Sequence, residues 1–335
     1  MSEALTTLLG KRTLRLLAHR AQGRPLPYSI TFILTHRCNF ACSYCDVPSA
    51  AGEEMSTGEY TSAIDELCEA GLARASFSGG EALLRRDAVS IIAHAKRRRL
   101  VTSLNTNAWL AERHLDDLAR VLDVLVVSLD GPEREHDLAR RQPGSYKRVV
   151  RVLERARAAG LKTATITVLT RDNLHVVDEV LDVSRRLGSF AYFQPAYLEC
   201  FERDRGLQPE LGARVLADVA ERLASSKRRG LPVGASSAYI ERLGRAPHFG
   251  RCERCNAGRY FATVMPDGTL VPCHLTSRAR SWPNGRTMGF AAAFRSLGRP
   301  PSGDGCAISP YQEADLVFGG DLGAARDAFA RFFGR

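Results

Sequence analysis

The chain has 335 residues, of which 44% are hydrophobic and 25% charged, a composition ordinary for a globular protein with one large and one smaller domain. It carries 47 basic and 37 acidic residues, a net charge of +10, which we attribute to arginines on solvated helix faces. No aromatic residues interleave with these bases as in a single-strand nucleic-acid platform, so we expect no nucleic-acid partner. No apolar run reaches the length of about 18 residues that a membrane span needs. The N-terminus also lacks the apolar core of a signal peptide. We therefore expect a cytoplasmic protein with no transmembrane segment, in which clustered cysteines bind metal more often than they form disulfides.

Short apolar runs alternate with amphipathic stretches from residue 28 to about residue 196. The runs predict buried parallel strands at 30–34, 75–77, 101–105, 124–130, 163–169 and 190–195. The amphipathic stretches predict helices at 57–70, 86–99, 111–121, 145–159 and 174–187. Gly71 and Gly160 are expected to end helices, and Ser145 to cap a helix that begins near Tyr146. Strands and helices in alternation predict an α/β fold, a partial (β/α)6 TIM-like barrel with its chemistry at the carboxyl ends of the strands.

An N-terminal extension and a cysteine-rich C-terminal region flank this barrel. Residues 5–17 predict an amphipathic helix that packs on the main domain, and residues 200–250 a mostly helical bridge. The stretch FATVMPDGTLVPC predicts a β-hairpin that turns at Pro266, Asp267 and Gly268. Residues 321–333 predict a final amphipathic helix. We expect an N-terminal extension at 1–27, a core domain at 28–225 and a small α+β domain at 226–335.

Three of the nine cysteines, Cys38, Cys42 and Cys45, form the pattern C-x3-C-x2-C directly after the first strand. Three thiolates on one short loop can hold three corners of a [4Fe–4S] cluster and leave its fourth iron open for chemistry. Tyr44 supplies an aromatic ring that can shield such a cluster from water. A zinc site that includes His36 is the alternative, although zinc knuckles favour paired C-x2-C units with histidine.

Small polar motifs stand where the following strands end. Ser78-Gly79-Gly80-Glu81 follows the second strand, and adjacent glycines there let a backbone approach a ligand closely. Asn105-Thr106-Asn107 ends the third strand, Ser128-Leu129-Asp130-Gly131 ends the fourth, and the run HDLAR at 136–140 comes next.

In this order, the cysteine triplet and the strand-end motifs resemble those of the radical S-adenosylmethionine (radical SAM) superfamily over residues 28–196. The resemblance implies that the three cysteines hold a [4Fe–4S] cluster whose open iron binds SAM. It implies further that the 78–81 turn holds the methionyl amino group, that the strand ends bind the ribose, and that Arg140 pairs with the carboxylate. The implied SAM-binding residues are Tyr44, Ser78, Gly79, Gly80, Glu81, Asn105, Asn107, Ser128, Asp130 and Arg140.

Four more cysteines lie in the C-terminal region: Cys252, Cys255, Cys273 and Cys306. A structural zinc ribbon is one interpretation of them. The stretch between Cys255 and Cys273 also resembles the element that opens the auxiliary-cluster regions called SPASM and Twitch, which implies one auxiliary [4Fe–4S] cluster. Cys306 is then the fourth ligand, or that position stays open to substrate as in the molybdenum-cofactor GTP cyclase. Cys68 is predicted to be a core thiol, and Cys200 a structural thiol or else a ligand or hydrogen-atom donor.

The resemblance implies an enzyme that reductively cleaves SAM to a 5′-deoxyadenosyl radical, which abstracts hydrogen from a substrate. An auxiliary cluster makes a net oxidation the expected outcome, with an external one-electron donor such as flavodoxin or ferredoxin. Peptide-modifying members often carry an N-terminal peptide-recognition domain, and only about 27 residues precede the first strand here. We therefore expect a small-molecule substrate, with a peptide- or protein-modifying maturase as the alternative. A non-enzymatic Fe–S or zinc protein that binds nucleic acid is the hypothesis of a different class.

Overall fold

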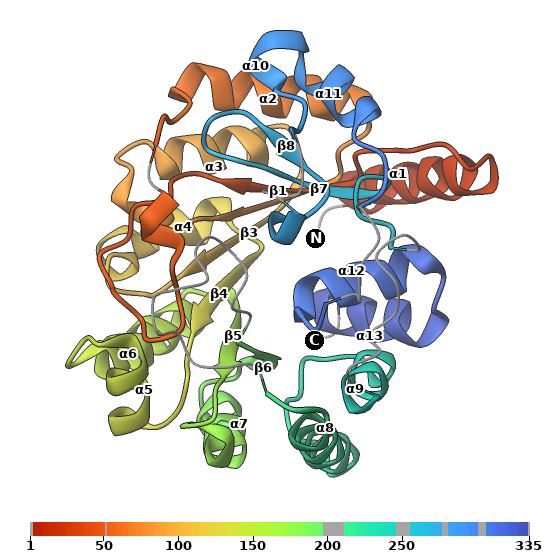
Figure 1. Cartoon of the computed structure of the whole chain (residues 1–335). Helices are drawn as coiled ribbons and strands as arrows, with labels where there is room; N and C mark the ends of the chain where they lie inside the picture. The colour runs from red at the N-terminus through yellow and green to blue at the C-terminus, as the bar shows by residue number, and fades with distance from the viewer. Residues whose placement is uncertain are drawn as a thin grey trace.

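The computed structural model describes residues 3–50, 52–196, 211–245, 255–276, 281–300 and 306–333. A single sheet with strand order β6-β5-β4-β3-β2-β1-β7-β8 forms its centre, and helices cover the outer face (Figure 1). The six predicted barrel strands are present as β1 (Ser29–Ile33), β2 (Arg74–Ser78), β3 (Val101–Thr106), β4 (Val124–Ser128), β5 (Lys162–Leu169) and β6 (Phe190–Pro195). Each pairs in parallel with its neighbour in sequence, which confirms the predicted partial TIM-like barrel.

The predicted helices connect these strands on the outside of the barrel (Figure 1). They are α2 (Thr57–Ala70), α3 (Ala88–Arg97), α4 (Leu115–Val121), α6 (Ser145–Ala158) and α7 (Val177–Arg186). Strands β1, β2 and β4 bury alternate residues, because one face of the sheet packs on these helices. Phe32 and Phe77 stack with ring centroids 5.6 Å apart and join Ile64 of α2 and Ile91 of α3 in one hydrophobic core. The opposite, concave face is less buried and is the side on which a site can form.

Within the barrel, one helix was not predicted from the sequence and one helix cap was predicted wrongly. Helix α5 (Glu133–Arg140) contains the HDLAR run and precedes α6. Ser145 is the first residue of α6 and does not cap it; Gly144, at φ 79°, occupies the N-cap position. The carboxylate of Asp137 accepts hydrogen bonds from Gly144 N at 2.6 Å and Tyr146 N at 2.9 Å. The anionic acceptor therefore satisfies the first amides of α6, and the Ser145 hydroxyl donates to it as well.

The C-terminal region extends the barrel sheet. Strands β7 (Phe261–Val264) and β8 (Leu270–Val271) form the predicted hairpin, and β7 also pairs in parallel with β1. The remaining helices are α8 (Ala213–Arg228), α9 (Ser237–Gly244), α10 (Gly285–Met288), α11 (Phe290–Ser296), α12 (Ser309–Gly319) and α13 (Leu322–Phe333). Helices α12 and α13 lie on the open side of the barrel, between β7 and β6 (Figure 1). The sheet thus runs on from the barrel into the C-terminal region, and a domain boundary near residue 226 stays a prediction.

The N-terminal helix α1 (Glu3–Ala21) contacts the main domain mostly through arginines. Arg12 donates to Arg99 O at 2.7 Å, Arg15 to Ala70 O at 3.0 Å, and Arg20 to Gly319 O at 2.6 Å. These carbonyls lie at or just past the ends of α3, α2 and α12, where cations offset the negative end of the helix dipole. Within the described ranges, no helix has the length and apolar character needed to cross a membrane.

Candidate functional site

The cysteine triplet lies on the loop that follows β1, and a glycine turn from the end of β2 holds this loop in place. Gly80 N donates to Thr35 O at 2.8 Å, and Glu81 N donates to Arg37 O at 2.9 Å. A Cβ atom on Gly79 would come within 2.4 Å of Thr35 O, and one on Gly80 within 2.4 Å of Arg37 O. The two glycines are therefore needed for the close approach of two backbones.

A cavity of about 160 Å³ opens beside this contact at the carboxyl ends of the strands. It is lined by Cys38, Phe40, Cys42, Tyr44, Cys45, Pro48, Ser78, Gly79, Gly80, Asn105, Thr106, Asn107, Ser128 and Arg140. The structure thus brings all three cysteines together with every predicted SAM-binding residue except Glu81 and Asp130. Residues from five separate segments of the chain meet there.

Glu81 is fully buried behind the cavity and ties the end of β2 to the end of β3. Its carboxylate accepts hydrogen bonds from Thr106 Oγ1 at 2.9 Å, Asn107 N at 2.8 Å and Leu83 N at 3.1 Å. Burial raises the pKa of Glu81 above its ordinary value, while these hydrogen bonds oppose the shift. Ala108, which follows Asn107 in the chain, has a φ of +69°, a strained conformation for a residue with a side chain. Glu81 thereby positions Asn107 at the cavity wall.

Asp130 is also fully buried and organises the other side of the cavity. Its Oδ1 accepts from Val168 N at 2.9 Å; its Oδ2 accepts from the Tyr44 hydroxyl at 2.7 Å and lies 2.6 Å from Arg140 Nε. Both oxygens are engaged by protein groups, so in this structure Asp130 holds Tyr44 and Arg140. Its expected contact with ribose stays a prediction.

Arg140 places a positive charge beside the cysteines. Burial opposes its ionisation, but Asp130, Tyr44 and Cys42 together outweigh burial and raise the pKa of Arg140 well above its ordinary value. The guanidinium carbon lies 5.5 Å from the centre of the Tyr44 ring, and Nη1 lies 3.8 Å from Cys42 Sγ. A permanent cation here favours thiolates and can pair with an anionic ligand group.

The donors around the cavity fit a [4Fe–4S] cluster. Phe40 N donates to Cys38 Sγ at 3.4 Å, and Asn107 Nδ2 lies 4.0 Å from the same sulfur. Burial raises the pKa of Cys38 and raises that of Cys45 to about 12, so these thiols stay protonated until a metal displaces the protons. Among the described residues, no group of three or more His, Cys, Asp or Glu side chains is arranged to hold a single metal ion. In a cubane, by contrast, each cysteine binds its own iron.

The C-terminal cysteines are only partly described. Cys255 packs on a small cluster that includes Tyr260 and Phe318, and Cys273 follows β8. Gln312 of α12 lies 3.9 Å from Cys306 Sγ. Cys252 and Cys200 lie outside the described residues, so the predicted auxiliary ligand set and the role of Cys200 stay predictions. Cys68 packs against the main core, as predicted for a core thiol.

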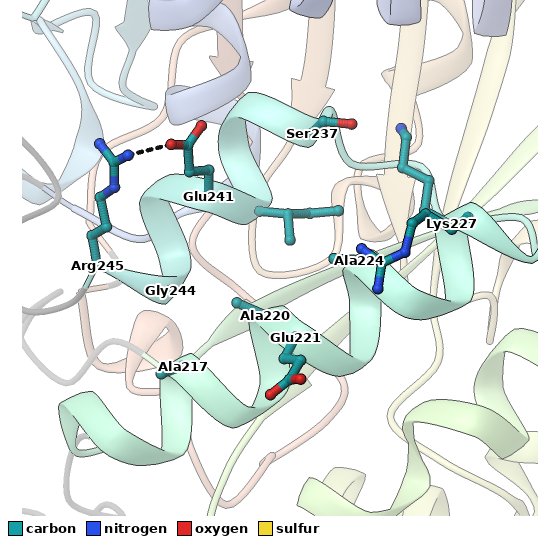
Figure 2. Close-up of a pocket in the computed structure, with 11 residues that line it drawn as sticks. Ala217, Ala220, Glu221, Ala224, Lys227, Ser237, Glu241, Gly244 and Arg245 are labelled. Atoms are coloured by element: carbon teal, nitrogen blue, oxygen red, sulfur yellow. Dashed lines mark hydrogen bonds and ion pairs between the residues drawn. The ribbon is translucent and has the colours of Figure 1, made fainter.

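A larger cavity of about 740 Å³ lies elsewhere, in the groove between α8 and α9 (Figure 2). Its floor is made of small residues such as Ala217, Ala220 and Gly244, and the Glu241–Arg245 ion pair lies at its rim. The groove contains no thiol and does not reach the strand ends. The smaller cavity is therefore the candidate active site.

Several residues that shape the site were given no role from the sequence, although His136 begins the HDLAR run. Asn39 Oδ1 accepts from Asn107 Nδ2 at 2.9 Å, and His136 Nδ1 accepts from Asp130 N at 3.1 Å. Phe40 and Trp109 meet edge to face, with centroids 5.7 Å apart. Each contact joins residues that only the folded barrel brings together, although Asn39 and Phe40 stand inside the cysteine motif.

A family model described as the radical SAM superfamily matches residues 32–183, which include the cysteine triplet and all the strand-end motifs. Residues 32–183 form a radical SAM domain. It is 29% identical to a PqqA peptide cyclase of Bradyrhizobium diazoefficiens, over 74% of this chain and 67% of that protein. It is 28% identical to the mycofactocin maturase MftC of Mycobacterium ulcerans, over 90% of this chain and 85% of that protein. The fold is similar to that of Streptococcus suis SuiB, solved with the precursor peptide SuiA, at a TM-score of 0.67 and 13% identity over 85% of this chain and 68% of that one.

This domain makes the chain an enzyme and confirms the predicted [4Fe–4S] cluster and SAM as its cofactors. The hypothesis of a non-enzymatic regulator that binds nucleic acid is set aside.

Replacement of Gly80 by Ala should separate the glycine turn from the cysteine loop, because the new Cβ would clash with Arg37 O and His36 O. We expect Gly80→Ala to lose most of the iron bound at the N-terminal triplet, measured as iron per chain after anaerobic reconstitution. Gly58→Ala is the matched control, since its Cβ meets no atom closer than 3.9 Å and lies in a helix. Equal iron in Gly80→Ala and the wild type would contradict the role assigned to the turn.

His136 should make the stability of the fold depend on pH. Burial, with a smaller contribution from the Arg140 charge, lowers the pKa of His136 to about 4. The unfolded chain titrates near pH 6.5, so the stabilisation is complete above that pH and is lost as the pH falls towards 4. We expect wild-type protein to lose about 3 kcal/mol more unfolding free energy between pH 7 and pH 4 than His136→Gln, measured by urea denaturation. Parallel pH profiles for the two proteins would contradict this assignment.

Proposed function

We propose that this chain is a peptide-modifying radical SAM enzyme, which cleaves SAM reductively and abstracts hydrogen from a peptide. The observation that carries the SAM chemistry is the cavity that brings three cysteines, the glycine turn and Arg140 together at the strand ends. The names of the relatives, a peptide cyclase and a maturase, favour a peptide substrate over the small molecule expected from the sequence.

Different residues of the cavity hold the cluster and the different parts of SAM. Cys38, Cys42 and Cys45 hold the cluster, which with SAM supplies the 5′-deoxyadenosyl radical. The backbone of the 78–81 turn receives the methionyl amino group, and Arg140 pairs with the carboxylate once SAM enters. The polar groups proposed to bind the ribose are Asn105, Asn107 and Ser128, which line the cavity. Tyr44 covers the cluster from water, and the buried carboxylates of Glu81 and Asp130 fix these groups in place.

The C-terminal region is proposed to hold one auxiliary [4Fe–4S] cluster through Cys252, Cys255, Cys273 and Cys306. The support is the hairpin between Cys255 and Cys273, which pairs with β1, the strand that leads into the cysteine loop. This assignment goes with an N-terminal extension at 1–27, a core domain at 28–225 and an auxiliary domain at 226–335. It also implies an external one-electron donor such as flavodoxin or ferredoxin, and a cytoplasmic enzyme.

Anaerobic reconstitution tests the SAM chemistry. Wild-type protein should bind about eight irons per chain, as two [4Fe–4S] clusters, and should form 5′-deoxyadenosine from SAM with a reductant. The triple variant Cys38→Ala, Cys42→Ala, Cys45→Ala should lose about half of the iron and all 5′-deoxyadenosine. Cys68→Ala, which removes a thiol from the core, should retain both. SAM cleavage by the triple variant would overturn the ligand assignment.

The substrate class is tested with short peptides encoded by genes next to the one for this chain. Mass spectrometry of such a peptide after turnover should show the loss of two hydrogen atoms, and the triple cysteine variant should leave the peptide unchanged. SAM cleavage stimulated by a sugar or aminocyclitol, with every peptide unaltered, would return the assignment to a small molecule.

A further inference from the structure

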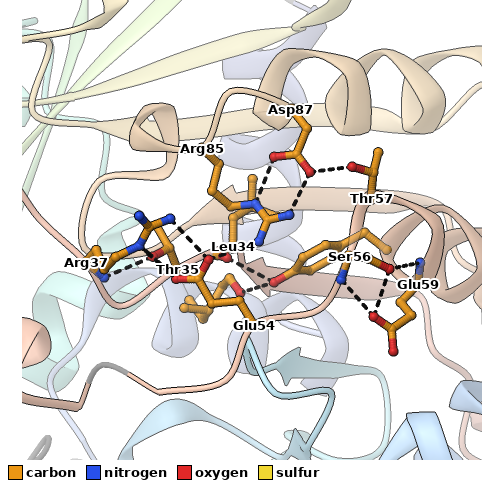
Figure 3. A network of polar contacts seen from close by, with 11 residues as sticks. Leu34, Thr35, Arg37, Glu54, Ser56, Thr57, Glu59, Arg85 and Asp87 are labelled. Carbon is orange, nitrogen blue, oxygen red and sulfur yellow. Dashed lines mark hydrogen bonds and ion pairs between the residues drawn. The ribbon is translucent and has the colours of Figure 1, made fainter.

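A network of charged and hydroxyl side chains lies beneath the cysteine loop, outside the cavity (Figure 3). Glu54 is its centre. The Thr35 hydroxyl donates to Glu54 Oε1, Arg37 Nε donates to the same oxygen at 3.1 Å, and Arg85 Nη1 donates to Oε2 at 3.1 Å. Thr35 and Arg37 both lie within the three residues before Cys38. Two of the three hydrogen-bonding partners of the Glu54 carboxylate therefore come from the start of the cysteine loop.

The backbone of Arg37 is held on both sides as a result. Its N–H donates to Thr35 Oγ1 at 3.0 Å, and its carbonyl accepts from Glu81 N at 2.9 Å. Thr35 is fully buried, so the hydroxyl that links Arg37 to Glu54 is shielded from water. The peptide unit before the first cysteine is therefore clamped between Glu54, through Thr35, and the glycine turn.

Arg85 anchors Glu54 from the opposite side. Its guanidinium forms a bidentate pair with Asp87 at 3.0 and 2.6 Å and lies 5.1 Å from the centre of the Tyr60 ring. The Tyr60 hydroxyl in turn donates to Leu34 O at 3.1 Å. The Arg85 side chain is only 9% exposed, whereas that of Arg37 is 56% exposed. Solvent therefore screens the Arg37–Glu54 pair more than the Arg85–Glu54 pair.

The segment that carries Glu54 is itself attached to the C-terminal hairpin. Met55 N donates to Pro266 O at 2.7 Å, and Arg286 pairs with Glu53 at 2.5 Å and with Glu59 at 2.6 Å. Burial opposes the ionisation of Glu54, but its hydrogen bonds and the two arginines outweigh it and lower the pKa of this carboxyl. Glu54 is thus a charged group held by the start of the cysteine loop, by Arg85, and by the attachment of its own segment to the C-terminal hairpin.

We propose that Glu54 is a positioning residue for the SAM cluster: it sets the place of Cys38 by holding Thr35 and Arg37 against Arg85. The proposal rests on the proposed function, since the loop it fixes is the one assigned to the cluster. Glu54 is not among the residues that line the cavity. Its loss should loosen the loop and weaken SAM binding while the barrel stays folded.

The substitution Glu54→Gln removes the charge and brings an amide NH2 towards groups that are themselves donors. We expect amide hydrogen exchange across residues 34–46 to become about fivefold faster in the cluster-loaded variant, with the barrel strands unchanged. We expect SAM to bind about tenfold more weakly, measured from the change that SAM makes in the electron paramagnetic resonance spectrum of the reduced cluster. Thr35→Val, which removes only the linking hydroxyl, should give the same local effects.

Glu59→Gln is the matched control. It makes the same chemical change five residues further on, where Glu59 pairs with Arg286 and completes the capping box of α2. We expect it to speed exchange at the start of α2 and to leave residues 34–46 and SAM binding as in the wild type. Wild-type values in both Glu54→Gln and Thr35→Val would overturn the proposal, as would uniformly faster exchange throughout both proteins. Wild-type protein that shows no SAM-dependent spectral change would instead contradict the proposed function, and exchange in the cluster-free chain would still report on Glu54.

Discussion

The site depends on the contact of two backbones, that of the glycine turn after β2 and that of the loop after β1. At Gly79 and Gly80 the chain passes so close to residues 35–37 that any side chain would overlap a carbonyl oxygen. Two hydrogen bonds then fix the loop relative to the sheet, although the loop has no regular structure before its 3-10 turn at Val47–Ala50. The rigid barrel therefore fixes the positions of the three thiols, as a preorganised site requires.

Buried carboxylates carry out most of the remaining organisation. Glu81 and Asp130 are inaccessible to water, and each links residues from neighbouring strand ends. An unpaired buried charge is costly, so each is retained only with a full set of donors around it. Because its donors come from different segments, each carboxylate fixes those segments relative to one another. Glu81 links β2 to β3, and Asp130 links β4 to β5 and, through Tyr44, to the cysteine loop. The polar residues at the cavity wall gain fixed orientations from these links.

The sequence was sufficient for the strands and for most residues of the cavity, because both follow from local patterns. Apolar runs mark the strands, and the βα rule places each strand-end motif at the same edge of the sheet, which is why Ser78, Asn105 and Ser128 could be placed together. The supporting contacts could not be predicted. Glu54 meets Arg85, and Asp130 meets Tyr44, across 31 and 86 positions of sequence. No spacing encodes such lateral pairs; they depend on how the helices and loops pack. The predicted cap of α6 was wrong for the same reason. The first amides of α6 donate to Asp137 and not to Ser145, and Asp137 lies in α5, a helix that was not predicted from the sequence.

The parallel pairing of β7 with β1 has a consequence for the order in which this protein matures. Strand β1 begins at residue 29, and its partner on that side begins at residue 261, so the sheet next to the cysteine loop stays an open edge until most of the chain has been synthesised. Contacts of such long range form late, because the loop that they close is long. The barrel strands from β1 to β6 can assemble in the order of synthesis, whereas the wall beside the cysteines is completed only once β7 has been made. Before that point the cysteine loop would be supported on one side alone, so a rigid site for the cluster depends on a strand more than 200 residues away in sequence.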